Sequence, residues 1–313
     1  MDKDMLDVLN SINKNLEEIK EILLQGKCNE ALSEQHASVM QIAATNICEI
    51  SQEVYSDEDN KEECEEENII EPIDRLTEFL DGKKITINNI EKEEYSTIFM
   101  QLAKYMGSNY ASIRDLMERI KFSMSNGNRF TFPIKSYPQH SISAMCQLCT
   151  RLYAISFLRN YTYKKSPNCI IEATPNRVPV AINFLTGKWF EIYIYQVIDK
   201  KLKELIAEDI IKESDIDIFR NVQIQIENGN YFEMDILVRI GEEYYWIECK
   251  TAKYQDHIYK YNKFAKQHGF DVKKTFLVIL EVPDEVAHGL NDIYDIKICN
   301  RDSFEDIFYA TIK

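Results

Sequence analysis

Two carboxylates and a lysine stand close to the ends of two runs that read as β-strands. Asp235 lies within residues 232–240, and Glu248 and Lys250 close residues 243–250. The two residues between the runs are enough for a β-hairpin turn. Because side chains alternate along a strand, Glu248 and Lys250 project from one face, and a hairpin would bring Asp235 beside them.

A cluster of this kind suits the chemistry of phosphodiesters. Burying such charges among apolar neighbours is costly unless a cation and a polyanionic substrate offset them. Mg²⁺ and Mn²⁺ prefer carboxylate oxygens, and a bound ion activates water and neutralises charge that develops on a phosphate. A lysine beside the ion would orient the water or stabilise the transition state. We therefore predict a metal-dependent phosphodiesterase site, although charged residues also stand at strand ends by chance in any soluble protein.

The flanking sequence predicts the elements that would hold this cluster. A helical spacing of apolar residues starts near residue 189 and places Glu191 in the first turn. A strand over 222–227 precedes the hairpin, residues 254–267 read as a second helix, and residues 275–280 read as a buried strand. The predicted order is helix, three strands, helix, strand, in an α/β (α+β) domain.

This αβββαβ order, with a helix glutamate ahead of the strand acids, resembles the core of the PD-(D/E)xK nuclease superfamily, which has the restriction-endonuclease-like fold. The resemblance implies that Asp235 and Glu248 are metal ligands, together with the backbone carbonyl of Cys249. It also implies that Lys250 is the catalytic lysine and that Glu191 is the helix carboxylate. The chain departs from the family's name in having no proline before the aspartate, as many members do.

A narrower resemblance covers roughly residues 180–300. The segments 184–191, 233–235 and 248–251 together look like the nuclease domain of CRISPR ancillary nucleases that cyclic oligoadenylate activates. Those enzymes carry a nucleotide-sensing domain ahead of the nuclease. Residues 1–170 lack the alternating strands and helices with a glycine-rich turn that such a domain requires, so control by a cyclic nucleotide is not carried over.

The net charge of -15 is unevenly distributed along the 313 residues. Residues 1–71 hold 19 of the 52 acids and 5 of the 37 bases, so the remainder of the chain is nearly neutral. Within that remainder, residues 119–165 contain no Asp or Glu and are interleaved with aromatic residues, some of which we expect in the core. Cations attract phosphates, and exposed rings stack on unpaired bases, so we favour a nucleic-acid-binding face over a merely solvated one. Its basic residues are Arg119, Lys121, Arg129, Lys135, Arg151, Arg159, Lys164 and Lys165.

A second basic stretch follows the proposed catalytic lysine. On the helix expected over 254–267, Lys253 and Lys260 fall on one face, which would flank the cluster and contact the same polynucleotide. The eight cysteines are scattered along the chain, which suits reduced thiols in a cytoplasmic protein. The lone pair Cys146 and Cys149 lacks the partners of a zinc site, so we expect it to face a helix core.

The first 71 residues differ from the rest in composition. Apolar residues over 5–23 follow a heptad spacing, which predicts either a short coiled coil that joins copies of the chain or an amphipathic helix docked on its own chain. No segment reaches 18 uninterrupted apolar residues, so we expect no membrane association. The predicted segments are a helical arm (1–53), an acidic linker (54–71), a mostly helical basic domain (72–165), a connection (166–180) and a nuclease-like domain (181–313).

The sequence as a whole predicts a Mg²⁺- or Mn²⁺-dependent endonuclease that cuts DNA in preference to RNA, with a role in prokaryotic defence or mobile elements implied by the resemblance. The alternative is a nucleic-acid-binding or assembly subunit that uses the same fold without turnover. A third reading is a coiled-coil interaction protein whose charged strand ends are incidental.

Overall fold

The computed structural model describes residues 71–91, 94–226, 229–252 and 254–313. The helical arm, the acidic linker up to residue 70, and Lys253 therefore lie outside the described residues. The described residues belong to one compact unit, Ile69–Lys313. None of their helices combines the length and apolarity that a bilayer crossing requires.

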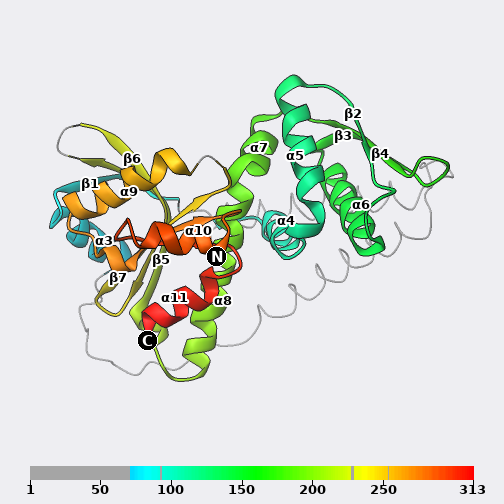
Figure 1. The fold of residues 1–313 in the computed structure, drawn as a ribbon. Coiled ribbons are helices and arrows are strands. Elements are labelled where there is room, and N and C mark those ends of the chain that lie inside the picture. Colours follow the sequence, from blue (N-terminus) through cyan, green and yellow to red (C-terminus); the bar gives the residue numbers. More distant parts are fainter. Residues whose placement is uncertain (1–70, 92–93, 227–228, 253) are drawn as a thin grey trace, which may run out of the picture. The chain divides into compact units, whose positions relative to one another are not determined.

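A six-stranded mixed sheet carries the predicted hairpin, and its strands lie in the order β1-β5-β6-β7-β8-β9. The pairs from β1 to β7 are antiparallel, whereas β8 and β9 run parallel to β7. The predicted αβββαβ order is confirmed, because α8 precedes β5, β6 and β7, and α9 and β8 follow them (Figure 1). The strands are β1 (Ile85–Asn89), β5 (Ile216–Ile226), β6 (Tyr231–Ile240), β7 (Glu243–Lys250), β8 (Thr275–Ile279) and β9 (Lys297–Asn300).

Helices cover both faces of this sheet. Strand residues such as Ile247 pack into one core with α8 and α11, and residues such as Trp246 pack into another core with α3, α9 and α10. This is the burial expected for strands that read as near-continuous apolar runs. The covering helices are α8 (Trp189–Ala207), α11 (Phe304–Ile312), α3 (Pro72–Asp81), α9 (Gln255–Gln267) and α10 (Asp284–Asn291).

The middle of the chain is helical, as expected, but it also forms a second, three-stranded antiparallel sheet in the order β2-β4-β3. The helix α6 ends at Ala154, and the acid-free region continues as the strand β3. The predicted segment boundaries remain predictions. The elements here are α4 (Thr97–Ser108), α5 (Tyr110–Asn126), β2 (Phe130–Pro133), α6 (Gln139–Ala154), β3 (Leu158–Lys164), β4 (Ile170–Pro175) and α7 (Pro179–Asn183).

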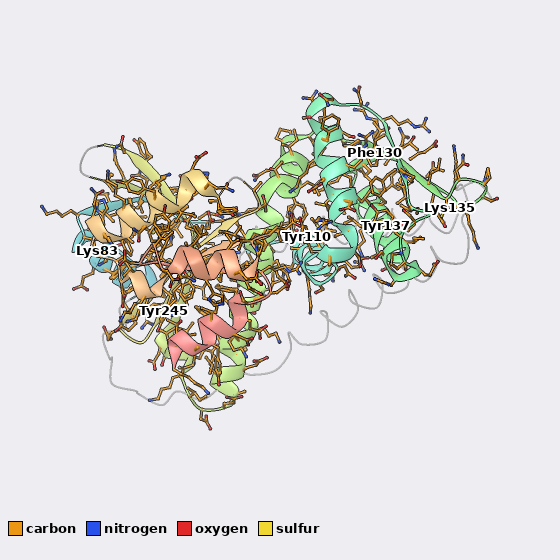
Figure 2. The ribbon with its side chains drawn as sticks, viewed as in Figure 1. Lys83, Tyr110, Phe130, Lys135, Tyr137 and Tyr245 are labelled. Atoms are coloured by element: carbon orange, nitrogen blue, oxygen red, sulfur yellow. The ribbon has the colours of Figure 1, made fainter. Side chains whose placement is uncertain are left out.

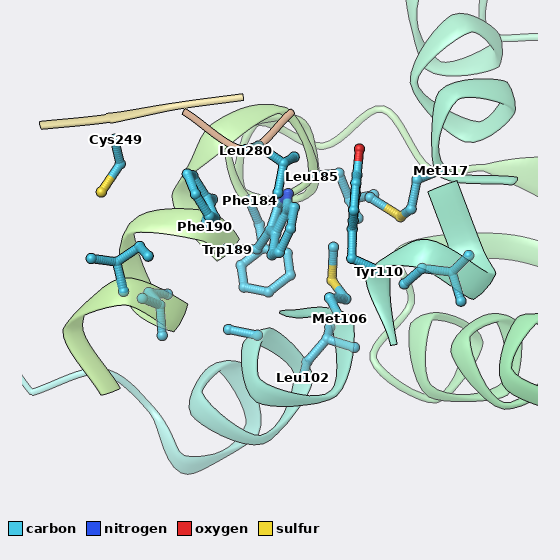
Figure 3. Packing of buried hydrophobic residues seen from close by; sticks show 14 of the residues in the cluster. Leu102, Met106, Tyr110, Met117, Phe184, Leu185, Trp189, Phe190, Cys249 and Leu280 are labelled. Carbon is cyan, nitrogen blue, oxygen red and sulfur yellow. The ribbon is translucent and has the colours of Figure 1, made fainter. Parts of the chain in front are cut away.

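One hydrophobic core joins the helical region to the face of the large sheet that α8 covers. Tyr110 at the start of α5 stacks on Trp189 at the start of α8, with ring centroids 5.7 Å apart (Figure 3). Gly107 of α4 permits the close approach of α4 to α8, because a Cβ there would lie 2.1 Å from the Tyr193 ring. In α6, Cys149 is buried, as expected for a cysteine facing the core.

Candidate functional site

The β6–β7 ladder stops at the residues that the sequence singles out. Paired positions run from Ile240 and Glu243 to Ile236 and Ile247. Asp235 and Glu248 would form the next pair, but the strands separate there, while β7 continues to pair with β8 as far as Lys250. The buried main chain at this fork needs hydrogen-bond partners other than the opposite strand.

The two carboxylates supply those partners. The Asp235 N–H donates to Glu248 Oε1 over 3.2 Å, and the Cys249 N–H donates to Asp235 Oδ2 over 2.8 Å. The Trp246 indole Nε1–H also donates to Glu248 Oε1, over 3.0 Å. Each carboxylate is thus fixed by the backbone of the other strand, so both side chains are held in place before any ligand binds.

A local irregularity in the sheet aims Asp235 into the fork. Met234 and Leu237 are three residues apart yet pack in the same core, although a regular strand would send them to opposite faces. Phe219 and Val222 on the neighbouring strand β5 are also three residues apart and pack in the same core. Asn221, between them, has a left-handed backbone with φ +46°. The β5–β6 register continues unchanged across this point, so both strands reverse their facing together.

Lys250 joins the carboxylates into one cluster. Its Nζ lies 3.3 Å from Glu248 Oε2 and 3.6 Å from Asp235 Oδ2. The same ammonium lies 5.4 Å from the ring centroid of Tyr261, which α9 brings over the fork. Two strand acids and the lysine therefore converge as the sequence predicts. Their catalytic role remains a prediction.

Glu191 enters this group from the first turn of α8. Its pKa is raised to about 7, first because burial disfavours the charged form and next because of the charge of Asp235. Burial, followed by the charge of Asp235, likewise raises the pKa of Glu248 to about 8. Buried carboxylates that repel one another in this way form a site whose ionised state is stabilised by an added cation.

The donor set fits a hard divalent cation. Asp235 Oδ2 and Glu248 Oε2 already face one positive charge, the ammonium of Lys250. No group of three or more His, Cys, Asp or Glu side chains is clustered for a metal ion within the part of the chain that the structure describes. Mg²⁺ commonly uses one or two carboxylates and keeps several waters, so two carboxylates are sufficient.

Two neighbouring residues were not anticipated from the sequence. Lys188, three residues before Glu191, forms ion pairs with both Glu191 and Glu91. Burial alone would lower the pKa of Lys188, but the charges of Glu191 and Glu91 outweigh burial and raise it. The three-residue spacing of Lys188 and Glu191 at a helix start is a detectable signal. Nothing in the sequence points to Glu91.

The predicted nucleic-acid contacts lie mostly on the helices and the small sheet of the middle region, and one of them lies on α9. Arg129 and Lys164 both pair with Glu172 of β4, at 2.6 and 2.8 Å, so the structure brings an acid into the acid-free tract. Arg151 stacks over Tyr105, with its Cζ 4.7 Å from the ring centroid. The remaining residues lie on α5 (Arg119, Lys121), after β2 (Lys135, Figure 2), on or next to β3 (Arg159, Lys165) and on α9 (Lys260).

The aromatic residues of this tract divide between core and surface. Phe130 and Phe157 are buried, whereas Phe122, Tyr153 and Tyr163 are 61%, 52% and 38% exposed. The exposed rings are available for stacking on bases.

No family model matches the chain, and no curated protein matches it. Among solved structures, the chain is similar to protein VC1899 from Vibrio cholerae, with 16% identity, 76% of this chain and 60% of that chain covered, and a TM-score of 0.50. It is also similar to Can2 from Sulfobacillus thermosulfidooxidans in complex with cyclic tetra-adenylate, with 15% identity, the same coverage and a TM-score of 0.49. The chain thus spans 60% of the length of each. At 16% identity the likeness to the Vibrio protein shows the fold alone.

Proposed function

We propose that this protein is a metal-dependent nuclease of the PD-(D/E)xK type, with its site in the fork between β6 and β7. The observation that carries the proposal is the set of interlocked contacts among Asp235, Glu248 and Lys250 where the two strands separate. Backbone N–H groups fix both carboxylates, so the cluster is pre-organised, as an electrostatic site for catalysis requires.

In this proposal Asp235 and Glu248 hold Mg²⁺ or Mn²⁺, together with the backbone carbonyl of Cys249. The ion, when bound, activates a water and neutralises charge on the scissile phosphate. Lys250 orients the water and stabilises the developing negative charge. Glu191 completes the site from α8, and the raised pKa values of Glu191 and Glu248 are consistent with carboxylates that take up a cation.

The polynucleotide would follow the basic residues of the helical region towards the site, with DNA favoured over RNA. Arg129 and Lys164 are paired with Glu172, so binding would exchange one carboxylate for phosphate oxygens at these two residues. Lys260 of α9 would provide a contact beside the fork. A role in prokaryotic defence, inside the cytoplasm, is proposed from the resemblance of residues 180–300 alone.

A cleavage assay tests the proposal. Purified protein is incubated with single- and double-stranded DNA and RNA in EDTA, Mg²⁺ or Mn²⁺, alongside Asp235→Ala. We expect cutting by the wild type only with a metal, and retained binding without cutting by Asp235→Ala. Binding without cutting by the wild type in every metal would favour a non-catalytic binding subunit instead, and absence of both would point to a coiled-coil interaction protein.

A further inference from the structure

Glu191 forms an ion pair with Lys188, and Lys188 also pairs with a second carboxylate, that of Glu91. Lys188 Nζ lies 3.2 Å from Glu191 Oε2 and 3.2 Å from Glu91 Oε2. Its side chain is 18% exposed, and its Nζ also lies 5.2 Å from the ring centroid of Tyr95. An ammonium therefore stands at equal distances from two carboxylates here.

The backbone around Lys188 is built for this position. A π-helical turn, Phe184–Lys188, leads directly into α8. Such wide turns are rare, and they occur often at functional sites. The Thr251 hydroxyl donates to the Thr186 carbonyl over 2.8 Å, which ties this turn to the residue after Lys250. The turn that carries Lys188 is thus anchored to the end of β7.

Glu91 is anchored to the neighbouring strand. Its N–H donates to the Arg220 carbonyl over 3.2 Å, and its Oε2 accepts a hydrogen bond from the Asn221 amide. Asn221 is the left-handed residue of β5 that lies across from Asp235. Glu91, Lys188 and Glu191 therefore form a row of alternating charges that is attached to β5 through Glu91 and, through the turn before α8, to the end of β7.

We propose that the ammonium of Lys188 is a built-in second cation of the site, in the position where a second divalent ion would otherwise bind between Glu91 and Glu191. The inference rests on the proposed nuclease function. Divalent ions of this kind lie about 2.1 Å from carboxylate oxygens. Each oxygen would have to move inward by roughly 1 Å from its present 3.2 Å to ligate an ion at the Nζ position.

The consequence is a site that takes one divalent ion rather than two. Two-metal sites neutralise the attacking and leaving oxygens of a phosphodiester with a pair of ions. Here Asp235 and Glu248 would hold one ion, and the ammonium of Lys188 would provide the second positive charge. Removing the Lys188 ammonium while leaving both carboxylates should open a second ion position.

Mn²⁺ binding, measured by electron paramagnetic resonance on the full chain without nucleic acid, tests this inference. We expect one bound ion for the wild type, two for Lys188→Met, and one again for the double variant Lys188→Met with Glu91→Ala. Lys203→Ala is the control, because Lys203 lies on α8, which follows the turn of Lys188, is 72% exposed and pairs with Asp199 at the surface. It should bind one ion.

One ion for Lys188→Met, in protein whose circular dichroism matches that of the wild type, would overturn the inference and leave the nuclease proposal intact. No Mn²⁺ binding by the wild type would overturn both. A second measurement needs no variant. Cleavage by the wild type at sub-saturating Mn²⁺ should rise with the first power of the ion concentration, and a second-power rise would contradict a built-in cation.

Discussion

The hairpin of β6 and β7 buries charged side chains at both of its ends, and the two groups are composed differently. At the closed end, next to the turn, Asp217 of β5 lies between the guanidinium groups of Arg75 and Arg239. Arg239 also donates to the Gly241 and Ser214 carbonyls, over 2.6 and 3.1 Å. At the open end, the cluster has more carboxylates than ammonium groups.

The closed end holds a structural ion network, whereas the open end holds a candidate site. At the closed end, Asp217 and the two arginines neutralise one another, so the ion pairs offer no charge for a ligand to neutralise. At the open end, burial and mutual repulsion raise the pKa values of Glu191 and Glu248, so the folded protein holds carboxylates that a cation would stabilise. The closed end should therefore govern stability, and the open end should govern activity.

The largest expected effect is on stability, at the closed end. Asp217→Asn should lower the free energy of unfolding by about 3–5 kcal/mol, because it leaves the buried guanidinium of Arg239 without its carboxylate, in an ion pair whose side chains are each 8% exposed. Urea denaturation measures the change. The folded fraction should still cut nucleic acid at the wild-type rate. Lost cleavage with unchanged stability would reverse the assignment of the two ends.

The next effect is on activity, at the open end. Lys250→Met should lower the cleavage rate constant by about 10²–10³-fold, as expected when one preorganised electrostatic group is removed. Lys274→Met is the matched control, because Lys274 is 19% exposed against 20% for Lys250 and also stands between two carboxylates, Glu243 and Asp271. Equal rates for the two variants would show that Lys250 has no special role.

A smaller effect is expected from the Tyr261 ring, which contacts the ammonium of Lys250. Tyr261→Leu should slow cleavage about tenfold, because it removes a buried cation–π contact, whereas Tyr261→Phe keeps the ring and should stay closer to the wild type. At the closed end, Tyr244 stacks on Phe79 with centroids 3.8 Å apart, so Tyr244→Leu should affect the melting temperature and not the cleavage rate. Equal cleavage by Tyr261→Leu and the wild type would show that the Tyr261 ring does not contribute to catalysis.

A separate effect is a pH dependence of stability without metal. The pKa of Glu248 rises from its ordinary 4.5 to about 8 in the folded protein, so this group lowers stability progressively as the pH rises through that interval. In EDTA, the melting temperature of Glu248→Gln minus that of the wild type should therefore increase from pH 5 to pH 8. A constant difference between the two melting temperatures across this range would mean that folding does not raise the pKa of Glu248.

Local sequence pattern was sufficient for the elements that carry the site. The strands expected over 232–240 and 243–250 are β6 and β7 to within one residue, and the helix expected from 254 begins at Gln255. Period-two alternation and a two-residue turn fix a hairpin locally, so the convergence of Asp235, Glu248 and Lys250 could be predicted.

Features that depend on distant pairing could not be read from local pattern. The edge strand β1 pairs with β5 across more than a hundred residues, and the strands of the smaller sheet are short and partly exposed. The change of facing at Asn221 and Asp235 is seen in the structure from the core that each neighbouring side chain joins. Glu91 follows a strand end with no motif of its own, so its contact with Lys188 needed the three-dimensional structure.

The most direct test of the central claim is cleavage of nucleic acid in Mn²⁺ by the wild type and by Asp235→Asn, purified identically. The amide keeps the size of the side chain and an oxygen for the Cys249 N–H, so the fork should stay folded. We predict cutting by the wild type that EDTA abolishes, and none by Asp235→Asn. Equal cutting by both proteins, or no cutting by the wild type on any substrate in either metal, would contradict the assignment of the β6–β7 fork as a nuclease centre.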